Sequence, residues 1–257
     1  MIGLLYQLYE RRLAREVGQG PVPPHIAVIL DGNRRYGERR GLVDPKAIYT
    51  LGARKLDEVL DWCSELCVPS VTLWVLSTEN FNRPIDQVSG ILAAIEAKMR
   101  ELADDPQIHS RRVRIQTIGK LELLPSSTVA AIQAAQEATA NYEGMVLTIA
   151  VAYSGRAEIV DAIRALLTEE RHAGATLDDA ITHISAEAIS RHLYMPEIPD
   201  PDLIIRTSGE VRLSGFLLWQ SAYSEFYFSD VHWPAFRKID FLRAIRAYQQ
   251  RKRRFGK

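Results

Sequence analysis

The sequence is poor in cysteine. Cys63 and Cys67 are its only two cysteines, and they lie four positions apart within a helical pattern. No second Cys or His pair has the spacing of a zinc site, so we expect two ordinary packed thiols. Two reduced cysteines without an export signal predict a cytoplasmic protein.

Net charge and long apolar runs are absent as well. Lys and Arg total 32, as do Asp and Glu, so the formal net charge is zero. Nucleic-acid-binding domains are usually basic, so this balance argues against a nucleic-acid partner. The basic C-terminal tail RKRRFGK is more typical of a solvated helix end. No apolar run is long enough to span a bilayer, and any phosphate site must come from local clusters of charge.

The first 24 residues differ in character from the rest of the chain. Residues 1–17 predict an amphipathic helix, and the segment GQGPVPP at residues 18–24 is typical of a linker. The apolar positions of this helix are Ile2, Leu5, Tyr6, Tyr9, Leu13 and Val17. We expect it to pack on the main domain, residues 25–257. The alternative is a helix that rests on a membrane surface, which would make the protein peripherally membrane-associated.

The main domain alternates short apolar runs with helical patterns. The predicted strands are His25–Leu30, Val71–Leu76, Val113–Gly119, Val146–Tyr153, Asp202–Arg206 and Glu225–Ser229. The predicted helices are Lys46–Leu66, Ile85–Leu102, Ser126–Tyr142, Ala157–Leu167 and Phe241–Gln250. This alternation indicates a single α/β domain with a central, mostly parallel six-stranded sheet flanked by helices. Ligands of such sheets bind beyond the carboxyl ends of the strands.

The first strand ends in a motif suited to phosphate. Asp31 and Gly32 follow the strand directly, and Asn33, Arg34, Arg35 and Tyr36 come next and are expected to open a helix. Glycine lets backbone approach a ligand closely, and arginines donate paired hydrogen bonds to phosphate oxygens. A carboxylate beside a phosphate usually needs a bridging cation, and Mg²⁺ suits these oxygen ligands. The alternative is a turn whose aspartate caps a helix and whose arginines are solvated.

Two other strands end in polar segments. STENFNRP follows the second strand and contains Ser77, Thr78, Glu79, Asn80, Phe81 and Arg83; its alternative interpretation is a capped polar loop. RTSGEVRLS follows the fifth strand, where Arg206, Arg212 and Ser214 could surround a diphosphate. Arg206 should be partly buried and therefore needs an anionic partner, which would be Glu210 or Asp202 if no ligand supplies it. The three segments together are expected to place five arginines around one crevice that holds more than one phosphate: Arg34, Arg35, Arg83, Arg206 and Arg212.

These segments resemble a known family. DGNRRY, STENFNRP and the long run DLIIRTSGEVRLSGFLLWQSAYSEFYF are similar to the cis-prenyltransferase, undecaprenyl-diphosphate-synthase-like family, from about His25 to the C-terminus. The N-terminal segment and the last run look most like the actinobacterial short-chain branch, which makes (Z,E)-farnesyl diphosphate. The resemblance implies a homodimer whose mostly parallel sheet adjoins an elongated apolar tunnel.

The resemblance also implies an activity. The chain would be an Mg²⁺-dependent prenyltransferase that condenses isopentenyl diphosphate with an allylic diphosphate, geranyl diphosphate first of all. Its product would be a short Z-prenyl diphosphate such as (2Z,6E)-farnesyl diphosphate. The alternatives are a longer-chain polyprenyl diphosphate synthase and a non-catalytic subunit of a prenyltransferase complex. A phosphatase of another α/β family is a further rival.

Site residues follow from the resemblance position by position. Asp31 and Asn80 would be catalytic, Asn80 by orienting groups because a neutral amide is a poor base. Asp31 and Glu225 would hold Mg²⁺. The residues implied to bind the two diphosphates are Gly32, Asn33, Arg34, Arg35, Tyr36, Ser77, Thr78, Glu79, Phe81, Arg83, Arg206, Arg212, Leu213 and Ser214.

The chain also departs from the family pattern. Residues 41–52, where many members have a mobile loop with an arginine and a Gly-His pair, contain neither Arg nor His, so Lys46 or Tyr49 would have to serve. Val211 stands where many members have histidine. Product length is expected to depend on bulky residues near the second strand and the helix after it, unless these are ordinary core: Val75, Leu76, Ile91, Leu92 and Ile95.

Overall fold

A six-stranded parallel sheet forms the centre of the protein. A computed structural model describes residues 2–251, with side chains from residue 6 onward. The strands are β1 (His25–Ile29), β2 (Ser70–Trp74), β3 (Arg114–Ile118), β4 (Val146–Ala150), β5 (Leu203–Arg206) and β6 (Glu225–Phe228). Their order is β3-β4-β2-β1-β5-β6, and every neighbouring pair is parallel. All six predicted strands are confirmed, each slightly shorter than expected.

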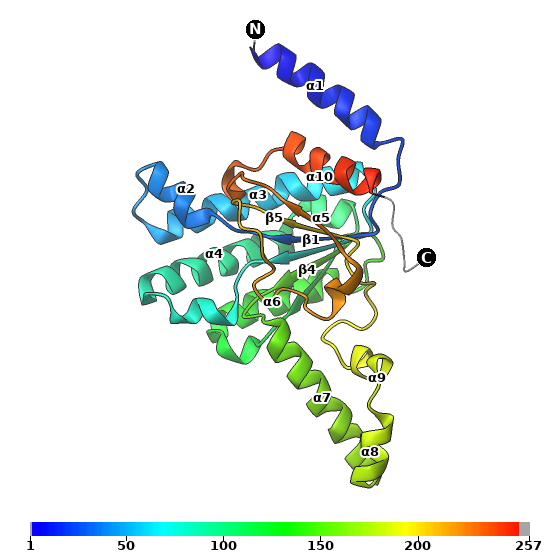
Figure 1. The fold of residues 1–257 in the computed structure, drawn as a ribbon. Coiled ribbons are helices and arrows are strands. Elements are labelled where there is room, and N and C mark those ends of the chain that lie inside the picture. Colours follow the sequence, from blue (N-terminus) through cyan, green and yellow to red (C-terminus); the bar gives the residue numbers. More distant parts are fainter. Residues whose placement is uncertain (1, 252–257) are drawn as a thin grey trace.

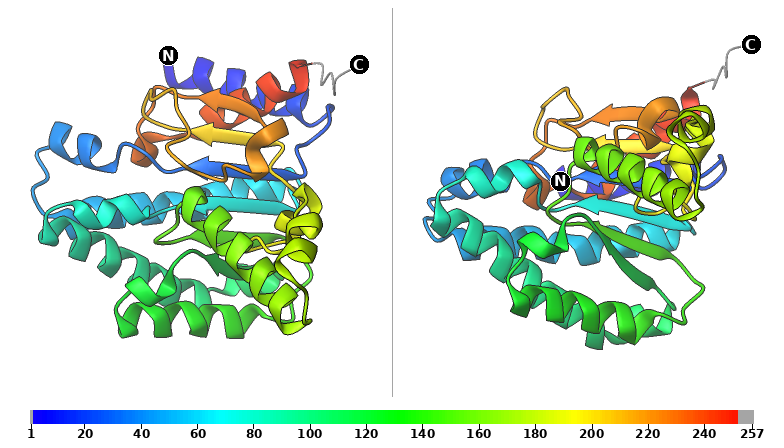
Figure 2. Two further views of the ribbon diagram at one scale, coloured as in Figure 1. Left: turned by 60° about the horizontal axis from the view of Figure 1, so that its bottom comes forward. Right: turned by 90° about the horizontal axis from the view of Figure 1, so that it is seen from below.

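Helices cover both faces of this sheet (Figures 1 and 2). They are α1 (Ile2–Val17), α2 (Asn33–Arg39), α3 (Pro45–Glu65), α4 (Ile85–Asp104), α5 (Pro106–Ser110), α6 (Ser126–Thr139), α7 (Gly155–His172), α8 (Leu177–His183), α9 (Ala186–Arg191) and α10 (Lys238–Gln250). Because side chains alternate along a strand, Ile26 and Val28 join the larger core with α3, α4, α6 and α10. Ala27 and Ile29 face the opposite core, which includes Trp74 and Phe216.

Three short helices have no counterpart in the sequence prediction. Each of α5, α8 and α9 has five to seven residues, which is too few for a helical period to show. Their caps do mark them. The side chains of Asp105, Thr176 and Ser185 each accept a hydrogen bond from a backbone N–H of the first turn that follows. Cap residues were therefore the signal that could have found these helices.

The helix α1 packs against α10 (Figure 2). Leu13 and Val17 are fully buried, at 1% and 0% exposure, and Tyr6 lies under the Arg237 guanidinium at 5.2 Å. Leu8, in contrast, is 53% exposed. The C-terminal half of α1 is therefore part of the domain core, as the packed interpretation expects. Within residues 2–251, none of the helices combines the length and the apolar character needed to cross a bilayer.

The chain order of the strands creates the crevice. β1 lies between β2 and β5, with Ile29 opposite both Trp74 and Arg206 at the carboxyl ends. The chain leaves these three neighbouring strands at one edge of the sheet, where helices on different faces diverge. The polar segments after β1, β2 and β5 therefore gather at that edge.

The packing of α1 gives a test with an internal control. Replacing Leu13 by alanine should lower the free energy of unfolding by about 2–5 kcal/mol, because it removes a buried leucine side chain. Leu8→Ala should change it by less than about 0.5 kcal/mol, because that side chain is exposed. Urea denaturation measures both. Equally small changes at the two positions would contradict a packed helix.

Candidate active site

A buried ion pair joins the ends of β1 and β5. Arg206 Nη2 donates a hydrogen bond to Asp31 Oδ2 at 2.8 Å, and Arg206 is only 5% exposed. Its Nη1 donates to Ser214 Oγ at 2.8 Å and to the Arg212 carbonyl at 2.5 Å. The anionic partner of Arg206 is therefore Asp31. The sequence-based alternatives for that partner, Glu210 and Asp202, were wrong.

Asp31 is held in its ionised form. Burial raises the pKa of this carboxyl, but the hydrogen bond and charge of Arg206, together with Ser208 and Arg35, outweigh burial and leave the pKa below the ordinary value of aspartate. A carboxyl with a depressed pKa stabilises the fold above its unfolded-state pKa of about 3.9, and that contribution is lost as the pH falls through the folded-state pKa. At neutral pH the site therefore presents a carboxylate between two guanidinium groups.

A second arginine closes the cluster. Arg35, on α2, donates from Nη2 to Ser208 Oγ at 2.6 Å and to Asp31 Oδ1 at 3.4 Å. Its Nη1 donates to Glu210 Oε1 at 3.2 Å, and Glu210 also pairs with Arg212. Two ion pairs thus connect the segments after β1 and β5: Arg206 with Asp31, and Arg35 with Glu210. We call Asp31, Arg35, Arg206, Glu210 and Arg212 the charged cluster.

Thr207 fixes the backbone at Asp31. Its hydroxyl accepts the Asp31 N–H at 3.0 Å and lies 2.7 Å from the Asp31 carbonyl, to which it donates. The residue that follows Asp31 is equally constrained. Gly32 has φ 101°, and a Cβ there would lie 2.7 Å from His232 Nδ1 and 2.9 Å from Ser208 Cβ. Only glycine fits, because three loops meet at this point.

The loop after β5 has an unusual backbone. Ser208, Gly209, Ser214 and Gly215 have φ values of 79°, 77°, 52° and 94°. Residues other than glycine seldom adopt this region, and such strain collects at functional sites. The turn lets the Ser214 hydroxyl reach Arg206, and the N–H groups of Ser208 and Gly209 donate to the Val231 and Ser229 carbonyls after β6.

His232 was missed by the sequence analysis. It is 8% exposed, and neither ring nitrogen has a hydrogen-bond partner among the described residues. Burial, together with the charges of Arg39 and Arg35, lowers the pKa of this histidine, and Asp31 opposes the change. A neutral imidazole therefore lies beside Gly32. No sequence signal marked it, because its position depends on the loop after β6.

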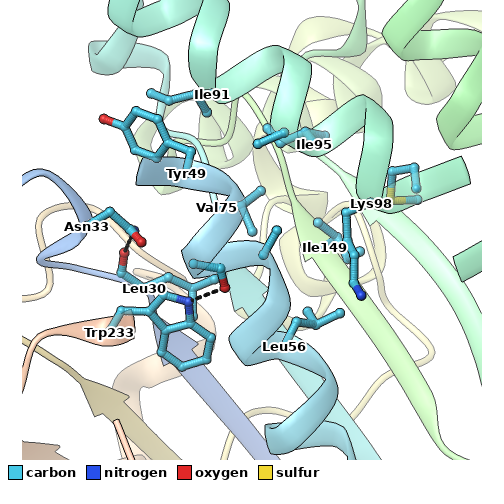
Figure 3. Close-up of a pocket in the computed structure, with 14 residues that line it drawn as sticks. Leu30, Asn33, Tyr49, Leu56, Val75, Ile91, Ile95, Lys98, Ile149 and Trp233 are labelled. Atoms are coloured by element: carbon cyan, nitrogen blue, oxygen red, sulfur yellow. Dashed lines mark hydrogen bonds between the residues drawn. The ribbon is translucent and has the colours of Figure 1, made fainter. Parts of the chain in front are cut away.

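Several residues of the first motif lie outside the charged cluster. Asn33 donates from Nδ2 to the Leu30 carbonyl at 3.0 Å and faces an apolar pocket (Figure 3). Arg34 is exposed and pairs with Glu38 at 3.6 Å. Tyr36 lies under the guanidinium of its neighbour Arg40 at 5.3 Å. Of this motif, the structure brings Asp31, Gly32 and Arg35 together.

The segment after β2 forms a capped turn. Thr78–Asn82 is a 3₁₀ helix, and the Asn80 side chain accepts the Ser77 N–H at 3.3 Å. Asn80 thereby orients the turn, and its amide oxygen is already engaged. Phe81 packs on the larger core, and Arg83 donates to the Tyr49 hydroxyl at 3.3 Å. Three of the five predicted arginines, Arg35, Arg206 and Arg212, share one cluster, and Arg34 and Arg83 make their contacts elsewhere.

The remaining residues of these segments have separate places. Thr78 is half-buried and Glu79 is exposed, both in the 3₁₀ turn. Leu213 packs against the smaller core beneath the loop after β5. Val211, two residues before it, is 74% exposed. Leu213 therefore supports the loop from below, while Val211 stands free at its surface.

Glu225 does not lie beside Asp31. It begins β6 and pairs with Leu203 at the start of β5, whereas Asp31 lies two residues beyond Ile29 at the other end of the sheet. Because a strand rises about 3.3 Å per residue, roughly 15 Å along the strands separates the two carboxylates. Glu225 pairs with Arg251 instead. Within a single chain the two carboxylates are therefore too far apart to hold one Mg²⁺ ion together.

Most of residues 41–52 is helical. Asp44 caps α3 by accepting from the N–H groups of Lys46 and Ala47 at 3.1 and 3.2 Å, and Pro45 occupies the first turn. A proline after an aspartate was the sequence signal for this start. Lys46 is exposed, whereas Tyr49 turns inward to Arg83. Of residues 41–52, Tyr49 is thus the one that contacts the segment after β2.

An apolar pocket adjoins the charged cluster, and Figure 3 shows the residues that line this pocket. It lies between α3 and α4, below the ends of β1, β2 and β4, and encloses a cavity of about 70 Å³. Leu30, Asn33 and Trp233 line its end nearest Asp31, and the Trp233 backbone N–H donates to the Asp31 carbonyl at 3.0 Å. Val75, Ile91 and Ile95 line the walls further in. Charged head groups and an apolar tail could therefore be held side by side.

The donor set fits one kind of metal. In the described part of the chain, no three His, Cys, Asp or Glu side chains gather as a metal-binding group. Mg²⁺ commonly uses one or two carboxylates and takes its other ligands from water and substrate phosphates. The single ionised carboxylate of Asp31 fits this mode of Mg²⁺ binding. It does not fit a metal site whose ligands all come from the protein.

Known proteins share both sequence and fold with this chain. The family model for undecaprenyl diphosphate synthase matches residues 29–256. An isoprenyl transferase of Deinococcus radiodurans is 52% identical over 256 residues, which cover 99% of this chain and 93% of that protein. A (2Z,6E)-farnesyl diphosphate synthase of Thermobifida fusca is 50% identical, over 98% of this chain and 97% of its own.

A solved structure extends the comparison to three dimensions. Lavandulyl diphosphate synthase of Lavandula x intermedia, in complex with dimethylallyl diphosphate, matches with a TM-score of 0.83 and 32% identity, over 92% of this chain and 99% of that chain. The names of these relatives specify different products, so the similarity identifies the family rather than the product. The chain belongs to the undecaprenyl diphosphate synthase family of cis-prenyltransferases.

Proposed function

We propose that this protein condenses isopentenyl diphosphate with an allylic diphosphate, geranyl diphosphate first of all, and forms a short Z-prenyl diphosphate such as (2Z,6E)-farnesyl diphosphate. The observation that supports this most directly is the charged cluster directly beside an apolar pocket. A prenyl diphosphate has the same two parts, a dianionic head and a hydrocarbon tail. The names of the relatives in Thermobifida fusca and Lavandula agree with such substrates.

Four members of the charged cluster, with Gly32 and Ser214 beside them, would form two head-group sites. Arg206, Arg212 and Ser214 would bind isopentenyl diphosphate through their guanidinium and hydroxyl donors. Asp31, Gly32 and Arg35 would hold the allylic diphosphate at the end of β1. In the free protein the Arg206 guanidinium pairs with the Asp31 carboxylate. When both substrates bind, phosphate oxygens must replace this carboxylate as the partner of Arg206. The exchange keeps Arg206 neutralised throughout.

The reaction begins when the allylic C–O bond ionises and diphosphate departs. Guanidinium groups placed beforehand stabilise the charge that develops on the leaving oxygens. The isopentenyl double bond attacks the allylic cation, and the departing diphosphate accepts the proton that is lost. Asn80 orients the turn after β2, because its amide oxygen already accepts the Ser77 N–H. The apolar pocket excludes water from the cation.

Mg²⁺ is part of this proposal. Asp31 would supply its protein carboxylate, and the diphosphate would supply further oxygens. Bound there, the ion would act as a Lewis acid on the leaving diphosphate. The chain's own contribution is to keep Asp31 ionised, which Arg206 and Arg35 do.

Product length depends on the pocket. Ligand pockets commonly measure about 300–1,000 Å³, so a cavity of about 70 Å³ must widen before a prenyl tail enters. Val75, Ile91 and Ile95 are wall residues, in agreement with a role in length. Leu76 and Leu92 pack into the core and are not among the lining residues.

A homodimer is the proposed assembly. β6 is an edge strand, and its Phe226 and Phe228 rings stack 6.4 Å apart. Tyr223, just before this strand, is 77% exposed. An exposed edge with aromatic side chains is a surface that proteins usually cover. A second copy of the chain placed on this edge would cover it.

A product assay tests the function. Purified protein, Mg²⁺, radiolabelled isopentenyl diphosphate and geranyl diphosphate are mixed, and the dephosphorylated products are sized by chromatography. A single fifteen-carbon alcohol with one new cis double bond is expected. A ladder of long polyprenols would retain the family and contradict the short product. Absence of product with every allylic primer would favour a non-catalytic subunit.

Light scattering of the same purified protein tests the homodimer.

The role of Asp31 is tested by Asp31→Asn. This change keeps a hydrogen-bond acceptor for Arg206 but removes the negative charge, so turnover should fall by roughly 100-fold or more. Asp61→Asn is the matched control, because Asp61 pairs with Arg111 at 2.7 Å on the surface; its turnover should stay normal. The stability difference between wild type and Asp31→Asn should be constant above about pH 5 and shrink below it, because wild-type Asp31 then becomes protonated. Near-normal turnover of Asp31→Asn would refute the metal role.

Wall and core positions give opposite predictions for product length. Val75→Ala enlarges the pocket, so longer products should accumulate. The free energy of unfolding should fall by no more than about 1–2 kcal/mol. Leu76, its neighbour in sequence, is 1% exposed in the core. Leu76→Ala should lower the free energy of unfolding by about 2–5 kcal/mol and leave product length unchanged. Product chromatography and urea denaturation measure the two effects. Identical products from wild type and Val75→Ala would contradict the wall assignment.

A further inference from the structure

One wall of the apolar pocket ends in a buried charge. Lys98, on α4, lines the pocket together with Leu56, Ile95, Met99 and Ile149. Its side chain is 7% exposed. Lysine is rarely buried to this extent unless its ammonium is paired. Figure 3 shows the Lys98 side chain running along the pocket beside Ile149.

The ammonium of Lys98 is paired with two carboxylates. Nζ donates to Asp57 Oδ1 on α3 at 2.5 Å and to Glu101 Oε1 on α4 at 3.0 Å. Both acids are partly exposed, at 40% and 59% of their side chains. The methylene stem of Lys98 therefore lies along the pocket, and its charge reaches carboxylates at the outer side of the α3–α4 contact.

Lys98 lies at the end of the pocket that is remote from the charged cluster. Asn33, Tyr49 and Trp233 are at the near end, and Figure 3 places them away from Lys98. Along α4, Lys98 follows Ile91 by about two helical turns, or roughly 10 Å. A tail that enters from Asp31 thus passes Ile91 before it meets Lys98.

We propose that Lys98 and its carboxylate partners form the polar floor of the pocket and limit the length of the product. This inference rests on the proposed function. A tail that grew past Lys98 would have to push the ammonium away from Asp57 and Glu101, or bury those charges against hydrocarbon. A bulky apolar wall can shift to admit a further isoprene unit, whereas a paired charge resists. The floor therefore sets a sharper limit than Val75 or Ile95.

A purely structural role makes a different prediction. The Lys98–Asp57 pair also connects α3 to α4, two helices that pack along each other. If the pair only connects these helices, its removal lowers stability without changing the product. Product size separates the two roles.

The test is Lys98→Met, which keeps an unbranched side chain of similar length and removes the charge. Arg100→Met is the matched control, because Arg100 lies on the same helix, is 63% exposed and pairs with Glu96 at 2.6 Å. Both variants receive labelled isopentenyl diphosphate and geranyl diphosphate. For Lys98→Met, the fraction of product longer than that of wild type should rise roughly tenfold or more, since a buried ion pair no longer has to be broken. Arg100→Met should give the wild-type product.

The outcomes are distinguishable. A wild-type protein that forms no product refutes the proposed function itself. A wild-type product that is unchanged in size in Lys98→Met, at similar total incorporation, refutes the floor.

A second measurement needs no variant. Binding of geranyl, farnesyl and geranylgeranyl diphosphates to the wild-type protein is compared by calorimetry without isopentenyl diphosphate, so that no turnover occurs. The floor predicts that affinity falls abruptly once the tail reaches Lys98. Affinity that rises steadily with tail length would refute the floor, even if Lys98→Met failed to fold.

Discussion

The Asp31–Arg206 ion pair is the interaction on which the site depends. Arg206 ends β5 with almost no exposure, so its charge requires an anion at all times. Asp31 supplies that anion from the end of β1, the neighbouring strand. The parallel register therefore fixes which two loops meet, and the charge of Arg206 keeps Asp31 ionised. Under the proposed function, substrate phosphates would enter by exchange with Asp31 rather than by filling a vacant arginine site.

The strands could be predicted because buried parallel strands are short apolar runs between helical patterns. β1 and β5 were located to within a residue at their ends, which also located Asp31 and Arg206 at one edge of the sheet. The partner of Arg206 could not be predicted. Acids close in sequence, such as Glu210, are equally plausible partners for Arg206. The actual partner, Asp31, is 175 positions away. Strand order brings the two together, and no local sequence pattern encodes that order.

Other errors have the same origin. Arg34 and Arg35 are adjacent, yet α2 turns Arg35 toward Asp31 and Arg34 toward Glu38, because consecutive residues point to different sides of a helix. Glu225 begins β6, as the predicted strand Glu225–Ser229 has it, but its distance from Asp31 within one chain became clear only with the register of β5 and β6. Sequence located the segments well, and the direction of each side chain came only with the fold.

Thr207 holds the backbone at Asp31 independently of the Asp31 side chain. Its hydroxyl holds both the N–H and the carbonyl of residue 31, so the loop keeps its course whatever side chain stands there. Arg206, in contrast, depends on the carboxylate itself. A descendant that lost activity would retain the loop but would be under pressure to replace residues 31 and 206 together. A change of Asp31 alone leaves the buried charge of Arg206 uncompensated and costs stability, so paired changes are the less costly route to a folded, inactive chain.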